Sequence, residues 1–325
     1  MKKVGITGLG KYLPKKVLYN KDLEKMVDTS DEWITTRTGI KERHIAAKHE
    51  AVSDLAVHAA CGALKEAGLK ASELDLLIVA TVTSDMQFPS TACVVQAKLG
   101  VKNAVCFDIS AACAGFLYAL VIAQQFIARN AYKNALVIGS EVLSCVTDWQ
   151  DRNTCVLFGD GAGAAVLSEV KSGGMLSSYL GSNGTFTDLL MVPAGGSRNP
   201  ASCKTIGERQ HYIKMRGNEL FKIAVKSMAD AAQNALSKAG LTSDDVDLFI
   251  PHQANIRIIS AVAKRLGLSE EKIFININKY GNTSSASTAI ALCEAQQEGK
   301  IKKGDVVVLD AFGAGLVWGA CVFKW

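Results

Sequence analysis

Cys113 is the residue of this chain whose surroundings best suit a reactive thiol. It follows the apolar run 104–109 and lies among small residues in segment 110–115, which reads Ser-Ala-Ala-Cys-Ala-Gly. From Ala114 onward, the spacing of apolar side chains predicts a helix. A cysteine at a helix start meets the positive end of the helix dipole, which lowers a thiol pKa, and small neighbours leave room for a substrate. We therefore expect Cys113 to be a nucleophile, although most cysteines are buried packing residues.

Two further polar residues follow patterns that place them at an edge of a sheet. His252 comes directly after the apolar run 246–251, and Asn282 lies in the turn-like segment 279–285. We expect both residues, like Cys113, to lie at C-terminal strand ends, where open α/β sheets bind ligands. Each alone could equally be a hydrogen-bonded loop histidine or a turn asparagine. Together they join a nucleophile to two groups that can hold an anionic oxygen.

The composition is that of a globular protein, with 49% hydrophobic and 21% charged residues in 325. This length allows one large core or two ordinary ones. The net charge of +5 is mild and the basic residues are dispersed, so we expect no nucleic-acid partner. The most apolar helical segment is too short to span a bilayer, and the N-terminus reads as a strand rather than a signal peptide. We expect a cytoplasmic protein without membrane association.

The nine cysteines are scattered, and none forms a Cys-x-x-Cys pair. This spacing excludes a zinc ribbon and a thioredoxin motif and argues against a disulfide framework, which fits the reducing cytosol. The glycine-rich segments 159–163 and 313–315 precede strand-like runs rather than helices. A dinucleotide-binding loop is therefore disfavoured, and we interpret these segments as tight turns beside the site.

The chain contains an internal repeat. Residues 63–79 and 235–251 both read as a helix ended by glycine, a short loop and a buried strand, at an offset of 172 residues. The same offset places Cys113 opposite Ser285. We therefore expect an α/β fold of two pseudo-symmetric halves with the functional site at their interface. The predicted halves are 1–170, with the cysteine, and 171–325, with the histidine and asparagine; the Gly- and Ser-rich segment 171–215 would connect them.

Local patterns predict several elements within these halves. Buried strands are expected at 75–81, 134–138, 247–250 and 305–310, and an amphipathic helix at 219–238. Thr29 and Glu32 match a capping box at the start of another helix. By residue type alone, Trp33 in that helix is more readily a packing residue than a platform for a ligand.

These motifs together resemble the β-ketoacyl-acyl-carrier-protein synthase III family over nearly the whole chain. The resemblance rests on segments 28–34 (Asp-Thr-Ser-Asp-Glu-Trp-Ile), 37–40 (Arg-Thr-Gly-Ile), 111–115, 158–164 (Phe-Gly-Asp-Gly-Ala-Gly-Ala), 252–255 (His-Gln-Ala-Asn) and 281–284 (Gly-Asn-Thr-Ser). It implies a thiolase fold, with two similar halves in five αβαβα layers, and a homodimer. It also implies an acyltransferase that starts type II fatty acid synthesis without a metal or an organic cofactor.

The resemblance implies a ping-pong decarboxylative Claisen condensation. Cys113 would take the acyl group from acyl-CoA, with acetyl-CoA as the expected primer. His252 and Asn282 would then bind the thioester carbonyl of malonyl-acyl carrier protein, where enolate charge develops as CO2 leaves. The backbone N–H groups of Cys113 and Gly315 would form the oxyanion hole.

The resemblance also assigns contacts to CoA and to the acyl group. Trp33 and Arg152 would sandwich the adenine and Arg37 would approach the phosphates, since guanidinium groups stack on rings and pair with phosphate. Further CoA contacts would be Thr29 and Asn255. The acyl pocket would be lined by Phe88, Leu143 and Phe158, with Phe88 supplied by the partner subunit and favouring short primers.

The acyl carrier protein would dock beside the pantetheine entrance. The expected contacts are Lys222, Gln253, Ala254, Asn255, Ile256, Arg257 and Lys264. For Lys222, Lys264 and the neighbouring Arg265, a solvated helix face is an equally good interpretation. The chain departs from the family pattern in two places. The usual Gly-Gly-Gly-Phe reads Gly-Ala-Gly-Leu at 313–316, which concerns the shape of the pocket, and Lys41 stands where arginine is common, a mild change at the surface.

Other functions fit parts of the sequence. A papain-like hydrolase also uses Cys, His and Asn, but its local cysteine signature is absent and its fold has no such duplication. A nonenzymatic acyl-binding protein would not need the thiol. Thiolases, hydroxymethylglutaryl-CoA synthases and type III polyketide synthases share the fold. A thiolase needs a second reactive cysteine, whereas Cys321 lies in a strand-like run. A hydroxymethylglutaryl-CoA synthase needs a catalytic glutamate, which has no evident position in this sequence. Type III polyketide synthases are usually longer. Primer length, branching and the pathway served stay open at this stage.

Overall fold

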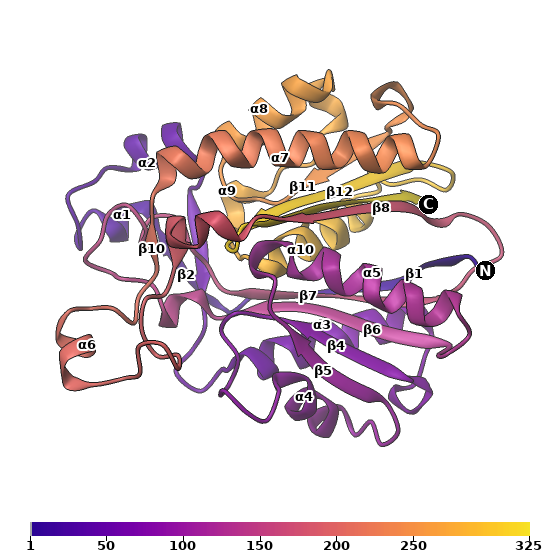
Figure 1. The fold of residues 1–325 in the computed structure, drawn as a ribbon, viewed down its shortest axis with the longest axis horizontal. Helices are drawn as coiled ribbons and strands as arrows, with labels where there is room; N and C mark the ends of the chain where they lie inside the picture. Colours follow the sequence, from indigo (N-terminus) through magenta and orange to yellow (C-terminus); the bar gives the residue numbers. More distant parts are fainter. Residues whose placement is uncertain (1) are drawn as a thin grey trace.

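Two mixed β-sheets lie one above the other in the computed structural model, which describes residues 2–325 (Figure 1). The first sheet has the order β1-β7-β6-β4-β5, and the second has the order β11-β12-β13-β8. Strands of the first sheet are β1 (Val4–Tyr12), β4 (Leu76–Ala80), β5 (Val105–Ile109), β6 (Asn134–Glu141) and β7 (Gly161–Glu169). Those of the second are β8 (Gly174–Ser182), β11 (Leu248–Pro251), β12 (Val306–Gly313) and β13 (Val317–Lys324).

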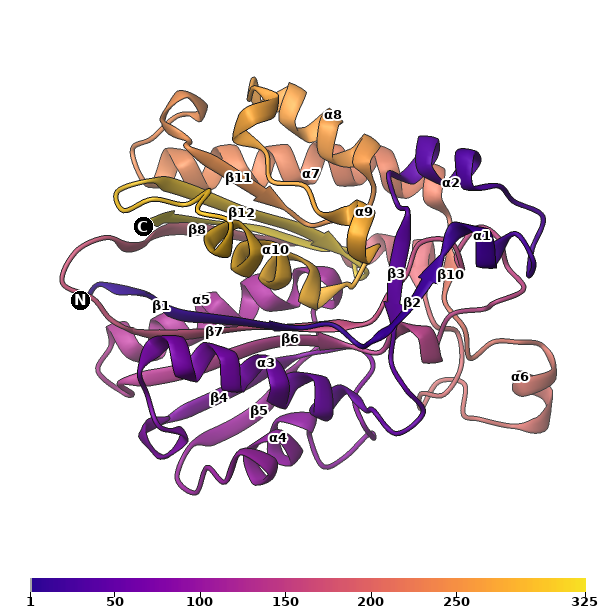
Figure 2. The same ribbon diagram turned by 180° about the vertical axis from the view of Figure 1, so that it is seen from behind.

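Helices cover both sheets and fill the space between them, which gives five layers (Figures 1 and 2). Helices α3 (Val52–Ala67) and α4 (Thr91–Leu99) pack on the first sheet, and α7 (Gly217–Lys238) and α8 (Ile256–Leu266) cover the second. Between the sheets lie α5 (Gly115–Ala128) and α10 (Ser285–Gln297). The predicted five-layered αβαβα arrangement is confirmed.

Smaller elements surround one end of the sheets. They are the antiparallel strand pair β2 (Lys16–Tyr19) and β3 (Glu42–Ile45), the helices α1 (Asn20–Leu23), α2 (Asp31–Thr38) and α9 (Ile277–Tyr280), and an excursion with β9 (Leu190–Met191), α6 (Cys203–Gly207) and β10 (Lys214–Met215). The excursion projects from the body of the molecule at α6 (Figure 1). Among residues 2–325, no helix combines the length and the apolar character that a membrane span requires.

The apolar runs of the sequence explain the central strands. All five residues of β4 are buried, because parallel strands covered by helices on both faces require apolar side chains on both. Helix α10 is buried around its circumference for the same reason, since it lies between the two sheets. Gly163 faces this helix: an added Cβ would lie 2.5 Å from the Cβ of Ala289. Gly161 and Gly163 thus lie within β7 and allow close helix packing, so their interpretation as a tight turn is wrong.

The offset of 172 residues recurs in the structure. It superposes β4 on β11, β6 on β12, and Gly68 after α3 on Gly240 after α7. It also superposes the starts of α5 and α10, so Cys113 and Ser285 lie at the N-terminal ends of the two central helices. The predicted strands and the helix at 219–238 are confirmed within a few residues.

Two local predictions are wrong. Segment 171–215 was expected to be a connection between the halves, but it contains β8, an edge strand of the second sheet. Its Gly and Ser residues give little strand signal, and the strand is stabilised by pairing with β13. Helix α2 is capped by Ser30 rather than Thr29, because the Ser30 hydroxyl accepts a hydrogen bond from the Trp33 N–H at 3.1 Å.

Candidate active site

Cys113 lies in a tight turn between β5 and α5. Ala112, the preceding residue, has a φ of 42°, in the left-handed region that non-glycine residues rarely adopt. A short 3-10 segment, Ala112–Ala114, then leads into α5. Gly313, at the end of β12, packs against this turn: an added Cβ would lie 2.6 Å from the Cys113 nitrogen. Residues from both sheets therefore enclose the thiol, and a strained turn presents it.

The three predicted chemical residues meet in one cavity. Cys113, His252 and Asn282 line a space of about 150 Å³, with Phe312 and Gly313. Cys113 comes from the start of α5, His252 follows β11 directly, and Asn282 precedes α10. Asn282 follows helix α9 and not a strand, so the predicted strand-end position is wrong for this residue. An isolated bridge to Phe158 holds it instead.

His252 is a neutral imidazole. Its backbone N–H donates to the Asp310 carbonyl at 2.7 Å, and only 2% of the residue is exposed. Burial lowers the pKa of His252 to about 3. The Nδ1 atom is buried without a hydrogen-bond partner among the described residues. Because an unpaired lone pair is tolerated better than an unpaired N–H, we assign the proton to Nε2.

The Asn282 amide is oriented by its neighbour along the chain. Its Oδ1 accepts the Ser284 backbone N–H at 2.8 Å. Its backbone is held by Leu157 and Gly159, through bonds of 2.9 and 3.0 Å. With Oδ1 engaged, Nδ2 is the free donor of the amide. The site therefore offers two neutral donors, the imidazole and the carboxamide, near one sulfur.

The predicted lowering of the Cys113 pKa is wrong for the free protein. Burial raises the pKa of the Cys113 thiol to about 12, and an ionised Glu141 would act in the same direction, whereas the Ser284 side chain lowers this pKa. Only 8% of the residue is exposed, so the cost of desolvating a thiolate exceeds the effect of the helix start. The unliganded site holds a thiol.

A second, mostly apolar cavity of about 240 Å³ also borders Cys113. Leu143 and Phe158 line it, as expected for an acyl pocket, together with Val82, Ala112, Val146, Leu190, Met191, Val192, Ile213, Ser284 and Ala314. Phe88 does not line it in this chain, because its side chain is 83% exposed. Gly315 lines neither cavity, whereas the neighbouring Ala314 and Gly313 each line one.

A surface cleft of about 550 Å³ leads toward the sulfur. It is lined by Trp33, Arg37, Asn255 and Arg257, and it shares Leu157, Met215, Gly217, Phe221 and Asn255 with the cavity at Cys113. The guanidinium carbon of Arg152 lies 4.6 Å from the centre of the Trp33 ring. Arg152 thus covers the indole directly, and no other ring can stack between the two groups in this arrangement. Thr29 does not line the cleft, and its hydroxyl is buried without a partner.

One predicted carrier-protein contact is wrong. Gln253 is 1% exposed, and its amide bonds four backbone groups, those of Pro251, Phe274, Asn276 and Ile277. It therefore cannot reach a partner surface and instead fixes the loop after β11. Its neighbours remain accessible: Arg257, Lys222 and Lys264 are exposed, and Ala254, Asn255 and Ile256 are half-buried. Asn255 also caps α8 through the Arg257 N–H.

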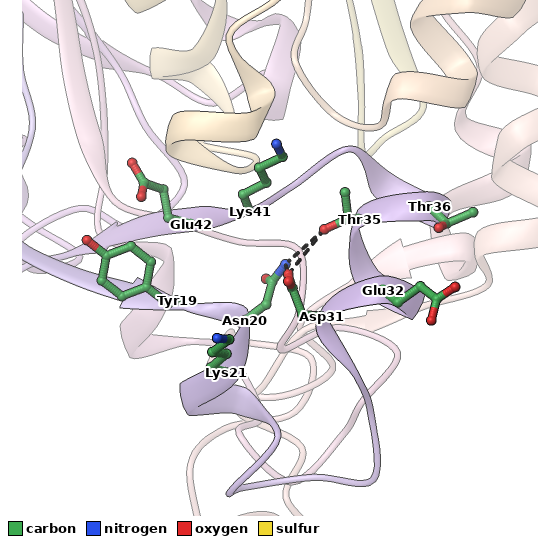
Figure 3. Close-up of a pocket in the computed structure, with 9 residues that line it drawn as sticks. All are labelled: Tyr19, Asn20, Lys21, Asp31, Glu32, Thr35, Thr36, Lys41 and Glu42. Carbon is green, nitrogen blue, oxygen red and sulfur yellow. Dashed lines mark hydrogen bonds between the residues drawn. The ribbon is translucent and has the colours of Figure 1, made fainter.

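A further cleft lies elsewhere and contains none of the predicted site residues (Figure 3). It measures about 680 Å³ and borders the face of α2 opposite Trp33 and Arg37. Its polar groups bond one another, since Asn20 donates to Asp31 at 2.7 Å and to Thr35 at 3.3 Å. We interpret these hydrogen bonds as structural contacts that fix the position of α2.

Two site residues were missed from the sequence. Glu141 ends the buried strand β6, and Ser284 precedes α10; both are fully enclosed beside Cys113. A signal for Glu141 was available, because a carboxylate that closes an apolar strand run must find partners inside the protein. Ser284 gave no such signal, since serine is common in turns.

The five layers and the enclosed thiol, imidazole and carboxamide define a condensing enzyme of the thiolase fold. Residues 107–184 match the family described as 3-oxoacyl-[acyl-carrier-protein (ACP)] synthase III, and residues 236–325 match its C-terminal part. The chain therefore belongs to the β-ketoacyl-acyl-carrier-protein synthase III family, as the resemblance indicated. It is an acyltransferase that condenses an acyl-CoA with malonyl-acyl carrier protein at the start of fatty acid synthesis.

Full-length relatives and solved structures carry this assignment. The chain is 61% identical over 322 residues to β-ketoacyl-[acyl-carrier-protein] synthase III of Caldanaerobacter subterraneus subsp. tengcongensis, which covers 99% of this chain and 97% of that protein. The counterpart in Natranaerobius thermophilus is 55% identical over 329 residues and covers 100% of both. The crystal structure of 3-oxoacyl-[acyl-carrier-protein] synthase III from Aquifex aeolicus superposes with a TM-score of 0.92 at 52% identity, covering 99% of this chain and 100% of that one.

Proposed function

We propose that Cys113, His252 and Asn282 carry out the condensation and that acetyl-CoA is the primer. The observation that supports these roles most strongly is the arrangement around the sulfur. Two cavities border Cys113: one is mostly apolar, and the other contains two neutral hydrogen-bond donors. An acyl group and a second thioester could therefore occupy the site together.

In the first half-reaction, the Cys113 sulfur attacks the thioester carbonyl of acetyl-CoA. The carbon–sulfur bond to CoA breaks, and the thiol proton leaves with the CoA sulfur, so acetyl-Cys113 and free CoA form. The backbone N–H groups of Cys113 and Gly315 would hold the tetrahedral oxyanion, where losing one donor typically costs about 3 kcal/mol. The high pKa of the free thiol requires deprotonation to accompany the attack.

In the second half-reaction, His252 Nε2–H and Asn282 Nδ2–H donate to the thioester carbonyl of malonyl-acyl carrier protein. The electron pair of the bond to the carboxylate moves toward that carbonyl, and CO2 leaves. The resulting carbanion attacks acetyl-Cys113, forms the carbon–carbon bond and expels the Cys113 thiolate, which takes up a proton from solvent to restore the thiol. Donors aimed at an oxygen that gains charge stabilise the transition state more than the substrate.

Substrate contacts follow the cleft toward the surface. Trp33, Arg37, Arg152 and Asn255 would hold CoA, with Thr29 supporting this region from behind. The carrier protein would dock on the exposed Arg257, Lys222 and Lys264 and on the adjoining Ala254, Asn255 and Ile256. Such a basic surface suits an acidic partner, because opposite charges speed association.

We also propose a homodimer in the cytoplasm, built from chains with halves 1–170 and 171–325. Strand β5 pairs only with β4, so it leaves an open sheet edge, and Val105 on that edge is 48% exposed. Open edges favour pairing with another chain. Across a two-fold axis, the partner subunit's Phe88 would close the acyl pocket and favour a short primer. The nine free thiols suit a reducing compartment.

The roles of His252 and Asn282 are tested by separating the half-reactions. Each variant, His252→Ala or Asn282→Ala, is first acetylated with labelled acetyl-CoA and then mixed with malonyl-acyl carrier protein. The expected result is normal acetyl loading with at least a hundredfold slower release of acetoacetyl-acyl carrier protein. Release at the wild-type rate would remove both residues from the mechanism.

A further inference from the structure

Ser284 joins the two reactive sides of the site. Its backbone has a φ of 48° and a ψ of −121°, a conformation that costs a non-glycine residue on the order of 1–3 kcal/mol. Its N–H donates to Asn282 Oδ1, and its side chain lines the acyl cavity beside Cys113. Hydrogen bonding by its hydroxyl lowers the pKa of the Cys113 thiol and that of the Glu141 carboxyl. Backbone strain at such a position indicates a functional constraint.

Glu141 forms a buried hub behind Ser284. It is 0% exposed and lies at the end of β6. Its Oε2 accepts hydrogen bonds from Thr83 Oγ1 at 2.5 Å, from Thr81 Oγ1 at 3.1 Å and from the Val82 N–H at 3.1 Å. Its Oε1 lies 2.9 Å from Ser285 Oγ. One carboxyl thus links the ends of β4 and β6 to the start of α10.

The hydrogen-bond pattern assigns a proton to Glu141. Ser285 Oγ lies 2.8 Å from the Ala80 carbonyl oxygen and has one hydrogen to donate. The carbonyl can only accept, so the Ser285 hydrogen satisfies it, and Glu141 Oε1 then donates its own proton to Ser285 Oγ. Oε2, with three donors, remains an acceptor. Burial raises the pKa of Glu141, which agrees with a neutral acid.

A neutral Glu141 has two consequences for the sulfur. A carboxylate at this position would disfavour a thiolate through its charge, and a carboxylic acid does not. An ionised carboxylate would also attract the Ser284 hydrogen more strongly than the thiolate could. With Glu141 protonated, the Ser284 hydroxyl is free to donate to Cys113 as negative charge develops there.

We propose that Ser284 is a further catalytic residue, which donates a hydrogen bond to the Cys113 thiolate, and that Glu141 is a positioning residue that acts as a neutral acid. The inference rests on the proposed role of Cys113 as the nucleophile. It adds a hydroxyl that stabilises the attacking sulfur and links this sulfur to the Asn282 amide through a single residue.

The first test measures the rate of Cys113 alkylation by iodoacetamide against pH. Ser284→Ala should move the midpoint of this profile upward by about 0.5–1 pH unit, which makes alkylation roughly 3–10-fold slower below the midpoint. Ser284→Gly, which also relieves the backbone strain, should shift it equally. Thr288→Val is the matched control, because the Thr288 hydroxyl is buried in α10 without a partner. An unshifted midpoint in Ser284→Ala would overturn the donor role, and a wild-type profile in Ser284→Gly alone would assign the effect to strain.

The second test uses Glu141→Gln, whose amide offers one acceptor and one donor in the places of the protonated acid. It should alkylate and condense within about twofold of the wild type, whereas Glu141→Ala should lose more than tenfold in kcat/KM. A Glu141→Gln variant that folds, by its unchanged circular dichroism, but is as slow as Glu141→Ala would show that an ionised carboxylate is needed. Acetylation of wild-type Cys113 by acetyl-CoA is measured in parallel. Its absence would reject the proposed function itself, whereas the variant results bear only on Ser284 and Glu141.

Discussion

The Oδ1 atom of Asn282 accepts the backbone N–H of Ser284 at 2.8 Å, so the strained residue before α10 sets the direction of the amide. The donor half of the carboxamide is thereby reserved for a ligand. An acceptor at the Nδ2 position would repel a developing enolate oxygen, whereas the amide stabilises it.

Asn282→Asp tests this orientation with almost no change in shape. The aspartate would keep the bond from Ser284 through one oxygen and present the other to the enolate. We expect acetyl loading within about threefold of the wild type and a 10²–10³-fold loss of condensation, measured by single-turnover assays of each half-reaction. Equal losses in both half-reactions would contradict a specific role in the malonyl step.

Trp33 should govern CoA binding without affecting the carrier protein. The guanidinium carbons of Arg152 and Arg37 lie 4.6 and 5.0 Å from the centre of its indole ring. Trp33→Ala should raise the KM for acetyl-CoA about tenfold, because a stacking platform for the adenine is lost, and should leave the KM for malonyl-acyl carrier protein unchanged. Glu32→Ala, on the opposite face of α2, is the control and should change neither constant. Parallel increases in both constants would remove the CoA role.

Phe88 should limit primer length from the partner subunit. Its 83% exposure in a single chain leaves the ring available to another protomer. Phe88→Ala should raise the rate with butyryl-CoA relative to acetyl-CoA by about tenfold, because a hydrophobic pocket discriminates added methylenes by 10–200-fold. Met86→Ala, another exposed residue of the same loop, is the control. The assay is a competition between the two primers with products read by mass; an unchanged ratio would contradict the proposed pocket.

Asp310 makes the stability of the protein depend on pH. Both carboxyl oxygens are buried without a hydrogen-bond partner among residues 2–325, and this burial raises the pKa of Asp310 well above its usual value. In the unfolded chain this group ionises near its ordinary pKa of 3.8. A raised pKa in the folded state therefore costs nothing at low pH and destabilises the protein progressively as the pH rises above about 4.

Asp310→Asn removes this titration. The difference in unfolding free energy between the variant and the wild type should increase in favour of the variant as the pH rises from 4 to 7. The increase should be up to about 1.4 kcal/mol per pH unit until the pKa of Asp310 in the folded protein is reached. Urea denaturation at several pH values measures this difference. A difference that does not vary with pH would show that Asp310 titrates normally in the folded protein.

The buried strands and the elements of the internal repeat could be predicted from the sequence. Strands β4 and β11 were found because buried parallel strands are continuous apolar runs, and the offset between them aligned the starts of α5 and α10. These patterns also placed Cys113 and His252 at the correct edges. Strand β8 was missed, because its stability comes from pairing with β13 rather than from its own residues.

Features that depend on three-dimensional enclosure could not be predicted. The raised pKa of Cys113 results from burial between two sheets, and local sequence showed only the helix start. Gln253 was expected to contact the carrier protein because of the family resemblance, but its amide is enclosed by bonds to the backbone of Pro251 and of segment 274–277. Ser284 and Cys113 are distant in sequence but line the same cavity, which local sequence could not show.

The most direct measurement is the mass of the Cys113 peptide after brief incubation of the protein with acetyl-CoA, followed by addition of malonyl-acyl carrier protein. The account predicts a single acetyl group on Cys113, lost in the second step as acetoacetyl-acyl carrier protein appears in equal amount. An acetyl group on another residue would contradict the account. Product formation by the wild type without acetyl-Cys113, together with full activity of Cys113→Ala, would also contradict it.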